Sequence, residues 1–345
     1  MIQKISSRFI ICFLACLLML SVSSPLFADS NSKTEIQIYS NPFGNATYVM
    51  SFALAEIINK YSDKLHATCL ESKSSSANML FLQQNPEARK NTIILSSPSS
   101  VTGAKKGAPP FRTPFTGLKA IASVLKNGVF FMTLDPKIKT IEDLEGKRVA
   151  VGPKGSTLAY EPEFVLKLGY GIFDKLGRVG YMPPAAIKDA LQDGSVQVGI
   201  QSSTMWGEGE EKEWAPIPAS EELMSSAKCY LIDLDPKAVR KAAAESGYPL
   251  FTLKAKKTAF GKSEPAGGNF LVTSNSWWAY ESMDPSIVRE ICRIIYEHAG
   301  EFGKYHASAK GLTSKSMASI VAIDENDFFP AAVEFYKEKG VKIGG

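Results

Sequence analysis

The segment that follows residues 148–151 (Arg-Val-Ala-Val) carries residue types that could bind an anion. The β-branched run ends in a Gly/Pro-rich turn, and the turn leads into an apolar pattern with helical spacing. The first N–H groups of a helix lack partners within the helix and carry partial positive charge. Gly152 and Gly155 would let a ligand approach the backbone closely. We therefore predict that Gly155, Ser156 and Thr157 contact a ligand.

Three other predicted strands end in similar segments. The residues that we expect to contact ligand there are Asn45, Thr47 and Tyr48 after strand 35–39, Ser97 and Ser99 after strand 92–95, and Ser202, Ser203 and Trp206 after strand 196–200. We call these segments, together with the first, the 44–48, 96–100, 152–157 and 201–206 turns. For any single turn, a plain strand–helix junction with a serine cap is the alternative, and Tyr48 and Trp206 suit a core as well as a pocket.

Neutral donors dominate the four turns. None of them contains an arginine, and Lys154 is their sole cation. We therefore predict that a ligand carboxylate is held mainly by hydroxyls and helix N–H groups, with Lys154 contributing less because a lysine on an exposed turn is screened. Lys154 precedes the second glycine, so the 152–157 turn is not a phosphate-binding Walker A loop.

Alternating strand and helix patterns predict an α/β fold with mostly parallel sheets. Helices are expected near 50–61, 158–168, 183–193, 235–246, 284–295 and 332–339, further strands near 118–124, 129–134 and 270–273, and a loop over 105–114. In such sheets ligands lie beyond the carboxyl ends of strands. Two of the four turns precede strand 129–134 and two follow it, which favours two lobes with a ligand cleft between them. We expect lobe 1 to contain residues 29–131 and 270–345, and lobe 2 residues 132–269, with two strands crossing between them.

The first 28 residues have the pattern of a secretory signal peptide. Lys4 and Arg8 precede the apolar run 9–22, and Ala28 provides a small residue for cleavage before Asp29. Cleavage would leave 317 of the 345 residues and lower the formal net charge from +4 to +2. No later run is apolar enough to predict a membrane span. We expect an exported, soluble, periplasmic protein, and the balanced charge gives no support for nucleic-acid binding.

Cysteine and histidine usage argues against metal and acid–base chemistry. Cys69, Cys229 and Cys292 form no CxxC motif and have no histidine close in sequence, which disfavours zinc and a disulfide-rich scaffold while leaving one disulfide open. The three histidines fall on stretches with helical patterns, away from the four turns, where surface or packing roles are usual. The sequence thus predicts no metal, no cofactor and no catalytic residue.

Three segments together give a family resemblance. Residues 44–48 (Gly-Asn-Ala-Thr-Tyr), 141–156 (beginning Ile-Glu-Asp-Leu-Glu-Gly-Lys-Arg-Val) and 334–341 (Glu-Phe-Tyr-Lys-Glu-Lys-Gly-Val) resemble the TAXI family of solute-binding proteins that serve TRAP transporters. The resemblance implies a two-lobed periplasmic-binding-protein fold of type II, with two crossover strands. It also implies capture of a small organic acid or amino acid, glutamate-like or a dicarboxylate, and its delivery to an ion-driven TRAP permease subunit. We expect the protein to be a monomer. An enzyme on the same fold and a ligand-sensing periplasmic protein remain alternatives.

Overall fold

The computed structural model describes residues 33–43, 45–207, 213–256, 259–261, 263 and 267–344. The predicted signal peptide and Gly44 lie outside the described residues. Residues Thr34–Gly345 form one compact unit. Within its described part, no helix combines the length and apolarity that a membrane crossing requires.

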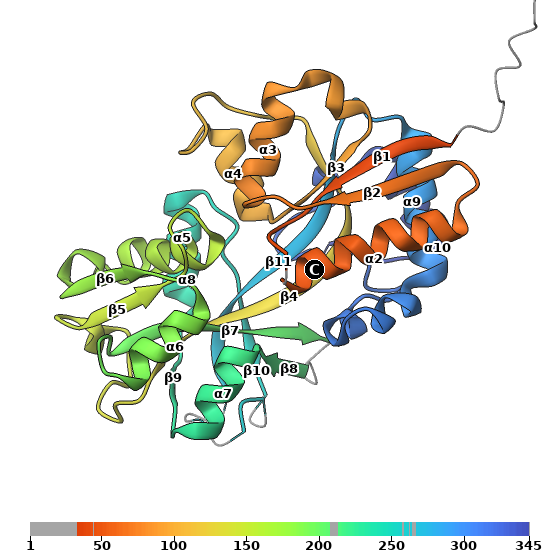
Figure 1. Ribbon diagram of the computed structural model, residues 1–345. Helices are drawn as coiled ribbons and strands as arrows, with labels where there is room; N and C mark the ends of the chain where they lie inside the picture. Colours follow the sequence, from red (N-terminus) through yellow and green to blue (C-terminus); the bar gives the residue numbers. More distant parts are fainter. Residues whose placement is uncertain are drawn as a thin grey trace, which may run out of the picture. The chain divides into compact units, whose positions relative to one another are not determined.

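The fold is α/β and is organised by one large sheet with the strand order β2-β1-β3-β11-β4-β7-β5-β6 (Figure 1). The strands are β1 Thr34–Tyr39, β2 Leu65–Leu70, β3 Thr92–Ser96, β4 Leu118–Thr133, β5 Arg148–Val151, β6 Arg178–Tyr181, β7 Val198–Trp206, β8 Glu213–Pro216, β9 Tyr230–Ile232, β10 Thr252–Ala255 and β11 Gly268–Tyr280. Pairing is parallel between β1 and its neighbours and between β5 and its neighbours. It is antiparallel where β3, β11, β4 and β7 meet.

Helices follow most of the parallel strands. They are α2 Ala46–Tyr61, α3 Ser75–Gln84, α4 Pro98–Lys106, α5 Thr157–Phe164, α6 Pro184–Gln192, α7 Pro218–Ser226, α8 Pro236–Ser246, α9 Pro285–His298 and α10 Pro330–Lys339. Asp235 and Asp284 cap α8 and α9: their side chains accept hydrogen bonds from backbone N–H groups in the first turn of each helix. Gly247 and Gly340 end α8 and α10 in the left-handed conformation.

The hydrophobic residues form separate cores in two lobes. The core of lobe 1 is built from residues between Ile36 and Leu125 and between Trp277 and Val341. Lobe 2 has two clusters, which come from residues between Val129 and Val272 with the addition of Val321. The long strands β4 and β11 pair with each other and belong to both lobes. The cores therefore change over between residues 125 and 129 of β4 and between residues 272 and 277 of β11.

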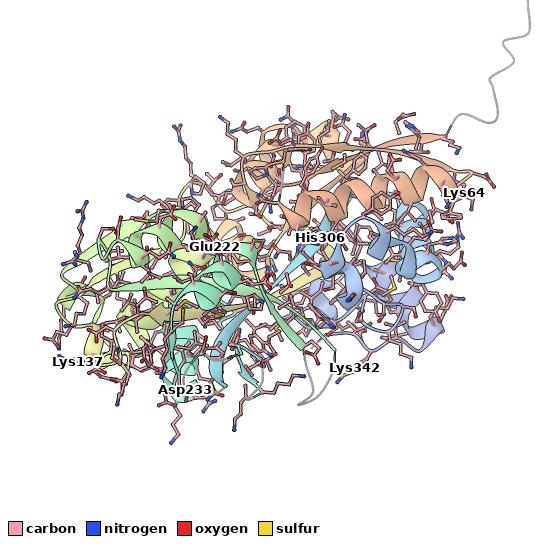
Figure 2. The ribbon with its side chains drawn as sticks, turned by 60° about the horizontal axis from the view of Figure 1, so that its bottom comes forward. Lys64, Lys137, Glu222, Asp233, His306 and Lys342 are labelled. Carbon is pink, nitrogen blue, oxygen red and sulfur yellow. The ribbon has the colours of Figure 1, made fainter. Side chains whose placement is uncertain are left out.

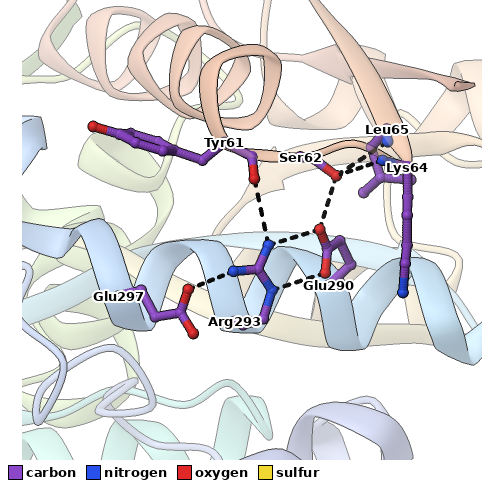
Figure 3. Close-up of polar contacts among 7 residues, drawn as sticks. All are labelled: Tyr61, Ser62, Lys64, Leu65, Glu290, Arg293 and Glu297. Atoms are coloured by element: carbon purple, nitrogen blue, oxygen red, sulfur yellow. Dashed lines mark hydrogen bonds and ion pairs between the residues drawn. The ribbon is translucent and has the colours of Figure 1, made fainter.

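Charged side chains lie on the outside of these lobes, and a partly buried ionic network joins helices α2 and α9 of lobe 1. Figure 2 labels Lys64, Lys137, Asp233 and Lys342, all of which are exposed. Figure 3 shows the network, in which Glu290 of α9 accepts hydrogen bonds from Ser62 (2.8 Å) and from Arg293 (2.8 and 2.9 Å). The Arg293 hydrogen bond lowers the pKa of Glu290, against the effect of burial. The network fastens the end of α2 to α9.

Three expectations about the elements were wrong. Residues 118–124 and 129–134 belong to one strand, β4, because β11 and β7 pair with it through the polar residues in between. Residues 201–206 lie within β7 instead of beyond its end. Residues 98–106 form helix α4, which includes 105 and 106, the first two residues of the predicted loop over 105–114. β2 was not predicted at all. For β4, β7 and β2, pairing with other strands decided the outcome, whereas the prediction rested on local residue types.

Candidate functional site

The 96–100 and 152–157 turns meet at the contact between the two lobes. The Ser97 and Thr157 hydroxyl oxygens lie 3.4 Å apart, and the Ser100 hydroxyl lies 3.0 Å from the Tyr160 hydroxyl. Ser99 Oγ donates to Glu161 Oε1 at 2.5 Å. These polar residues, to which we add Ser156, form what we call the interlobe cluster: Ser97, Ser99, Ser100, Ser156, Thr157, Tyr160 and Glu161.

The lobe 1 half of the cluster is the first turn of α4. Pro98 occupies the first helical position, where its missing N–H is no loss. Ser97 caps the helix: its hydroxyl accepts from Ser100 N at 3.2 Å and lies 3.0 Å from the Ser100 hydroxyl. The prediction that Ser97 and Ser99 follow the end of a strand is therefore correct as to position, whereas helix α4, which begins there, was not predicted.

The lobe 2 half of the cluster includes the 152–157 turn, whose backbone lies close against the start of helix α5. A Cβ on Gly152 would lie 2.4 Å from Leu158 Cβ, so only glycine fits there. Pro162 has no N–H to donate to Leu158 O, and Gly152 N donates to that carbonyl instead, at 3.0 Å. Gly155 has a φ of +81°, which glycine adopts without strain. The turn is thus held rigidly against the start of α5.

Ser156 stands at the N-cap position of α5, yet its side chain makes no cap hydrogen bond. Its hydroxyl oxygen is buried and has no hydrogen-bond partner in the part of the chain that the structure describes. A buried polar group left without a partner costs about 1–3 kcal/mol. The Ser156 hydroxyl is therefore available to a ligand that enters the cluster.

Glu161 is the functional candidate that the sequence analysis missed. Its side chain exposes 2 % of its surface, and Ser99 is its hydrogen-bond partner. Burial raises the pKa of Glu161 to about 8, although the Ser99 hydrogen bond acts in the opposite direction. The sequence analysis considered the strand ends and the histidines, whereas Glu161 lies within α5, beyond the 152–157 turn. Helical spacing was the available signal, because Glu161 lies four residues after Thr157 and so on the same face.

Aromatic rings enclose the cluster on the lobe 2 side. The ring of Tyr248, beyond the end of α8, lies 5.8 Å from that of Tyr160 and 4.7 Å from that of Phe164. Burial raises the pKa of Tyr160 above the range in which it could ionise near neutral pH. Lys106, at the far end of α4, donates to Ser246 O at 2.5 Å and so adds a further contact between the lobes.

Residues 45–48 lie at the same sheet edge as the 96–100 turn. β1 and β3 run parallel, and the amide of Asn78 donates to Ser40 O (2.9 Å) and to Leu95 O (3.1 Å), near the ends of both strands. Thr47 Oγ1 accepts from Asn41 Nδ2 at 3.0 Å. Asn45 is exposed, and the Tyr48 ring packs edge-on against Phe43 with a centroid distance of 5.4 Å. Thr47 and Tyr48 make these contacts with Asn41 and Phe43 of lobe 1.

The 201–206 turn does not join the cluster. Ser202 O accepts from the Ser220 hydroxyl at 2.9 Å inside lobe 2, and the Ser203 hydroxyl is buried without a partner among the described residues. Trp206 lines a different pocket, of about 170 Å³, which it shares with β4 and with residues 308–316. The prediction that these three residues follow the end of a strand was wrong, because all three belong to β7; that they contact a ligand stays a prediction.

The histidines make local contacts elsewhere. His66 pairs with Glu35 at 2.8 Å, His298 stacks on Tyr61 with centroids 3.6 Å apart, and His306 Nδ1 accepts from Ser308 N at 3.1 Å. The packing and surface roles that we predicted are correct, but His66 lies on strand β2 and not on a helix. Within the described residues no group of acidic, histidine and cysteine side chains could hold a metal ion. Cys69, Cys229 and Cys292 are free thiols.

The fold and the cluster together define a two-lobed α/β protein in which hydroxyl groups and one buried carboxyl meet between the lobes. A family model described as the NMT1-like family matches residues 39–340, and the chain belongs to that family. No curated protein matches the sequence.

Solved structures with a similar chain course are distant in sequence. A TctC solute binding protein from Polaromonas is 15% identical, with 80% of this chain and 86% of that chain covered and a TM-score of 0.47. MatC from Rhodopseudomonas palustris with bound malate is 11% identical, with 89% and 96% covered and a TM-score of 0.49. The periplasmic aliphatic sulphonate binding protein SsuA from Escherichia coli is 12% identical, with 90% and 84% covered and a TM-score of 0.43.

Proposed function

We propose that this protein is the solute-binding component of a TRAP-type transporter, of the TAXI family, that captures a small organic acid or amino acid between its lobes. The observation that carries the proposal is the interlobe cluster, in which two helix starts from different lobes bring hydroxyl donors together. Such an arrangement suits a ligand carboxylate, because helix N–H groups and hydroxyls hold anions without a formal cation. The protein would act in the periplasm after removal of residues 1–28, as a monomer.

The ligand would replace the direct contacts between the lobes. Ser97, Ser99, Thr157 and the unpartnered Ser156 hydroxyl supply the donors. Asn45, Thr47 and Tyr48 stand at the same sheet edge and would contact the ligand from lobe 1. The closed complex would then dock on the TRAP permease subunit, which takes up the solute.

A ligand screen tests the proposal. Thermal unfolding is measured with a panel of amino acids, 2-oxo acids and dicarboxylates, because a ligand present at 100 times its Kd stabilises the protein by about 2.7 kcal/mol. Titration calorimetry with each stabilising compound then gives stoichiometry and Kd. One compound bound per chain without turnover is the expected result, and no stabilisation by any acid contradicts the proposal.

Ser156→Ala and Lys154→Ala separate the two ways of holding a carboxylate. Loss of a hydrogen bond to a charged group costs roughly 1.5–3 kcal/mol, so Ser156→Ala should weaken binding by about 10- to 100-fold. Stability without ligand should not fall, because the Ser156 hydroxyl has no partner among the described residues. Lys154 is exposed, with Nζ 5.8 Å from the Tyr181 ring centroid, and Lys154→Ala should cost under about 1 kcal/mol. Ser226→Ala on α7 is the matched control. Abolition of binding by Lys154→Ala, with a silent Ser156→Ala, would replace this mechanism with a lysine salt bridge.

An enzyme on the same fold is the second candidate, and Glu161 favours it. A carboxyl whose pKa lies near 8 could serve as a general acid. Incubation of the purified protein with the compounds that bind it distinguishes the two candidates, because a carrier returns its ligand unchanged and an enzyme converts it.

A further inference from the structure

Glu161 is a buried carboxyl without a counter-charge. It extends from α5 of lobe 2 to the first turn of α4 of lobe 1, where Ser99 donates to it. No ion pair reaches it from any residue that the structure describes, and burial, with that one hydrogen bond, accounts for its raised pKa. Buried charges in proteins are usually paired, because removal of a lone charge from water is very unfavourable.

The titratable groups around Glu161 do not supply that charge. On its own helix, Tyr160 stays protonated because burial raises its pKa. From beyond α8, Tyr248 faces the same space and its pKa is also raised by burial. Helix α4 presents hydroxyls at its first turn, and its Lys106, two turns further along, is bonded to Ser246 O. The described surroundings of Glu161 are therefore neutral.

We propose that Glu161 is a ligand-binding residue that selects solutes carrying a protonated amino group beside a carboxylate. This inference rests on the proposed function and narrows its ligand class from small acids to amino acids. The carboxylate of the solute would take the hydroxyl donors and helix starts, and the ammonium group would provide the counter-charge to Glu161. A dicarboxylate without an amino group would instead place a second anion beside a buried acid.

Access to Glu161 follows from its position between the lobes. Its hydrogen-bond partner belongs to lobe 1, so separation of the lobes breaks that contact and exposes the carboxyl to an incoming solute. When the lobes close again on a bound amino acid, a charge-assisted hydrogen bond from the ammonium group replaces or joins the bond from Ser99. Selection then acts in the closed complex, where the water that would weaken the pair is excluded.

Glu161→Gln tests the inference, because glutamine keeps the size of the side chain and removes its charge. The probes are the proteinogenic amino acids and the 2-oxo acids that correspond to them, such as L-glutamate with 2-oxoglutarate, screened by thermal shift and measured by titration calorimetry. The wild-type protein should bind the amino member of a pair about 100-fold more tightly than the oxo member, and Glu161→Gln should remove most of that preference by weakening the amino member. Glu163→Gln, on the same helix and only half-buried, is the control and should change neither Kd.

The number of protons released on binding distinguishes a ligand-binding role of Glu161 from a purely structural role, which would not change that number. At pH 7 a carboxyl with a pKa near 8 is mostly protonated, and it must ionise to pair with an ammonium group. Binding of the amino acid should therefore release close to one proton, measured by calorimetry in buffers of different ionisation enthalpy, and Glu161→Gln should release none. If proton uptake or no exchange is observed with a tightly bound amino acid, the role of Glu161 is wrong.

The outcomes of the screen separate this inference from the function on which it rests. Equal or tighter binding of the oxo acids by the wild-type protein overturns the selection by Glu161 and leaves the solute-binding function standing. Absence of binding by every probe overturns the solute-binding function itself. Circular dichroism would show whether the Glu161→Gln protein is unfolded. If it is, the number of protons that the wild-type protein releases and the ligand preference of Ser99→Ala test the role of Glu161 instead. Ser99→Ala keeps the charge and should retain the preference for the amino acid.

Discussion

Glu161→Gln should make the unliganded protein more stable at neutral and alkaline pH. The folded protein raises the pKa of Glu161 to about 8 by burial, whereas an unfolded chain gives glutamate a pKa of about 4.3. The group is therefore harder to ionise when folded. Its contribution to stability is fully present below the unfolded pKa and is lost as the pH rises towards 8. One pKa unit corresponds to about 1.4 kcal/mol, so the total loss at and above pH 8 is about 5 kcal/mol as an upper figure.

Opening of the lobes limits how much of this loss appears in unfolding. The carboxyl regains water as soon as Ser99 and α4 move away, and this requires less disruption than unfolding of lobe 2. Ionisation of Glu161 therefore destabilises the closed form relative to the open form before it unfolds the protein. We expect unliganded wild-type protein to have a larger radius of gyration at pH 9 than at pH 6, and Glu161→Gln to have the same radius at both.

Urea denaturation of both proteins between pH 5 and pH 9 measures how ionisation of Glu161 changes the free energy of unfolding. The difference in the free energy of unfolding between variant and wild type should grow with pH in favour of the variant and level off above pH 8. Other titrating groups cancel in this difference, because both proteins contain them. A difference that is independent of pH, together with equal radii at pH 6 and pH 9, would refute the reasoning about a buried protonated Glu161.

Three further predictions concern the strands that cross between the lobes, ligand-induced closure and export. Gly128→Ala should destabilise the protein by more than about 2 kcal/mol in urea, because its Cβ would lie 2.0 Å from the Trp214 ring, and overpacking of a close-packed site forces shifts; an unchanged midpoint contradicts this packing. Small-angle scattering should show a smaller radius of gyration on saturation with a ligand, with the motion at residues 125–129 and 272–277; an unchanged radius with bound ligand argues against closure. Mass spectrometry of protein from the native envelope should find Asp29 at or near the N-terminus, and retention of residues 1–28 would overturn the periplasmic assignment.

Elements with strong local signals were predicted well from the sequence. Helices α8 and α9 begin with Asp-Pro and show apolar residues at helical spacing, so both their type and their N-terminal caps follow from local chemistry. The buried strand β3 was predicted by its unbroken apolar run. β7 is different, because its hydroxyl-rich second half resembles a turn and becomes a strand only through its neighbours β4 and β8.

The residues of the candidate site show the same difference between positions set by local signals and positions set by contacts between distant segments. The positions of Ser97 and Thr157 follow from strand–helix junctions, and the structure places their hydroxyls 3.4 Å apart. Trp206 was predicted beside them only because β7 was expected to end earlier. Glu161 was missed because the sequence shows a charged residue in a helix, which is usually exposed, and only the packing of α4 over it makes it buried.

The energetics of this contact explain why a solute could control closure. The polar contacts that α4 makes with lobe 2 pair Ser97, Ser99, Ser100 and Lys106 with Thr157, Glu161, Tyr160 and Ser246. Each such hydrogen bond contributes about 1 kcal/mol net, so together they roughly offset the penalty of about 5 kcal/mol for keeping an ionised Glu161 buried. Without ligand, closed and open forms would thus be close in free energy near pH 8. A solute whose ammonium group pairs with Glu161 removes this penalty only in the closed form, so its binding shifts a nearly balanced population towards the closed form.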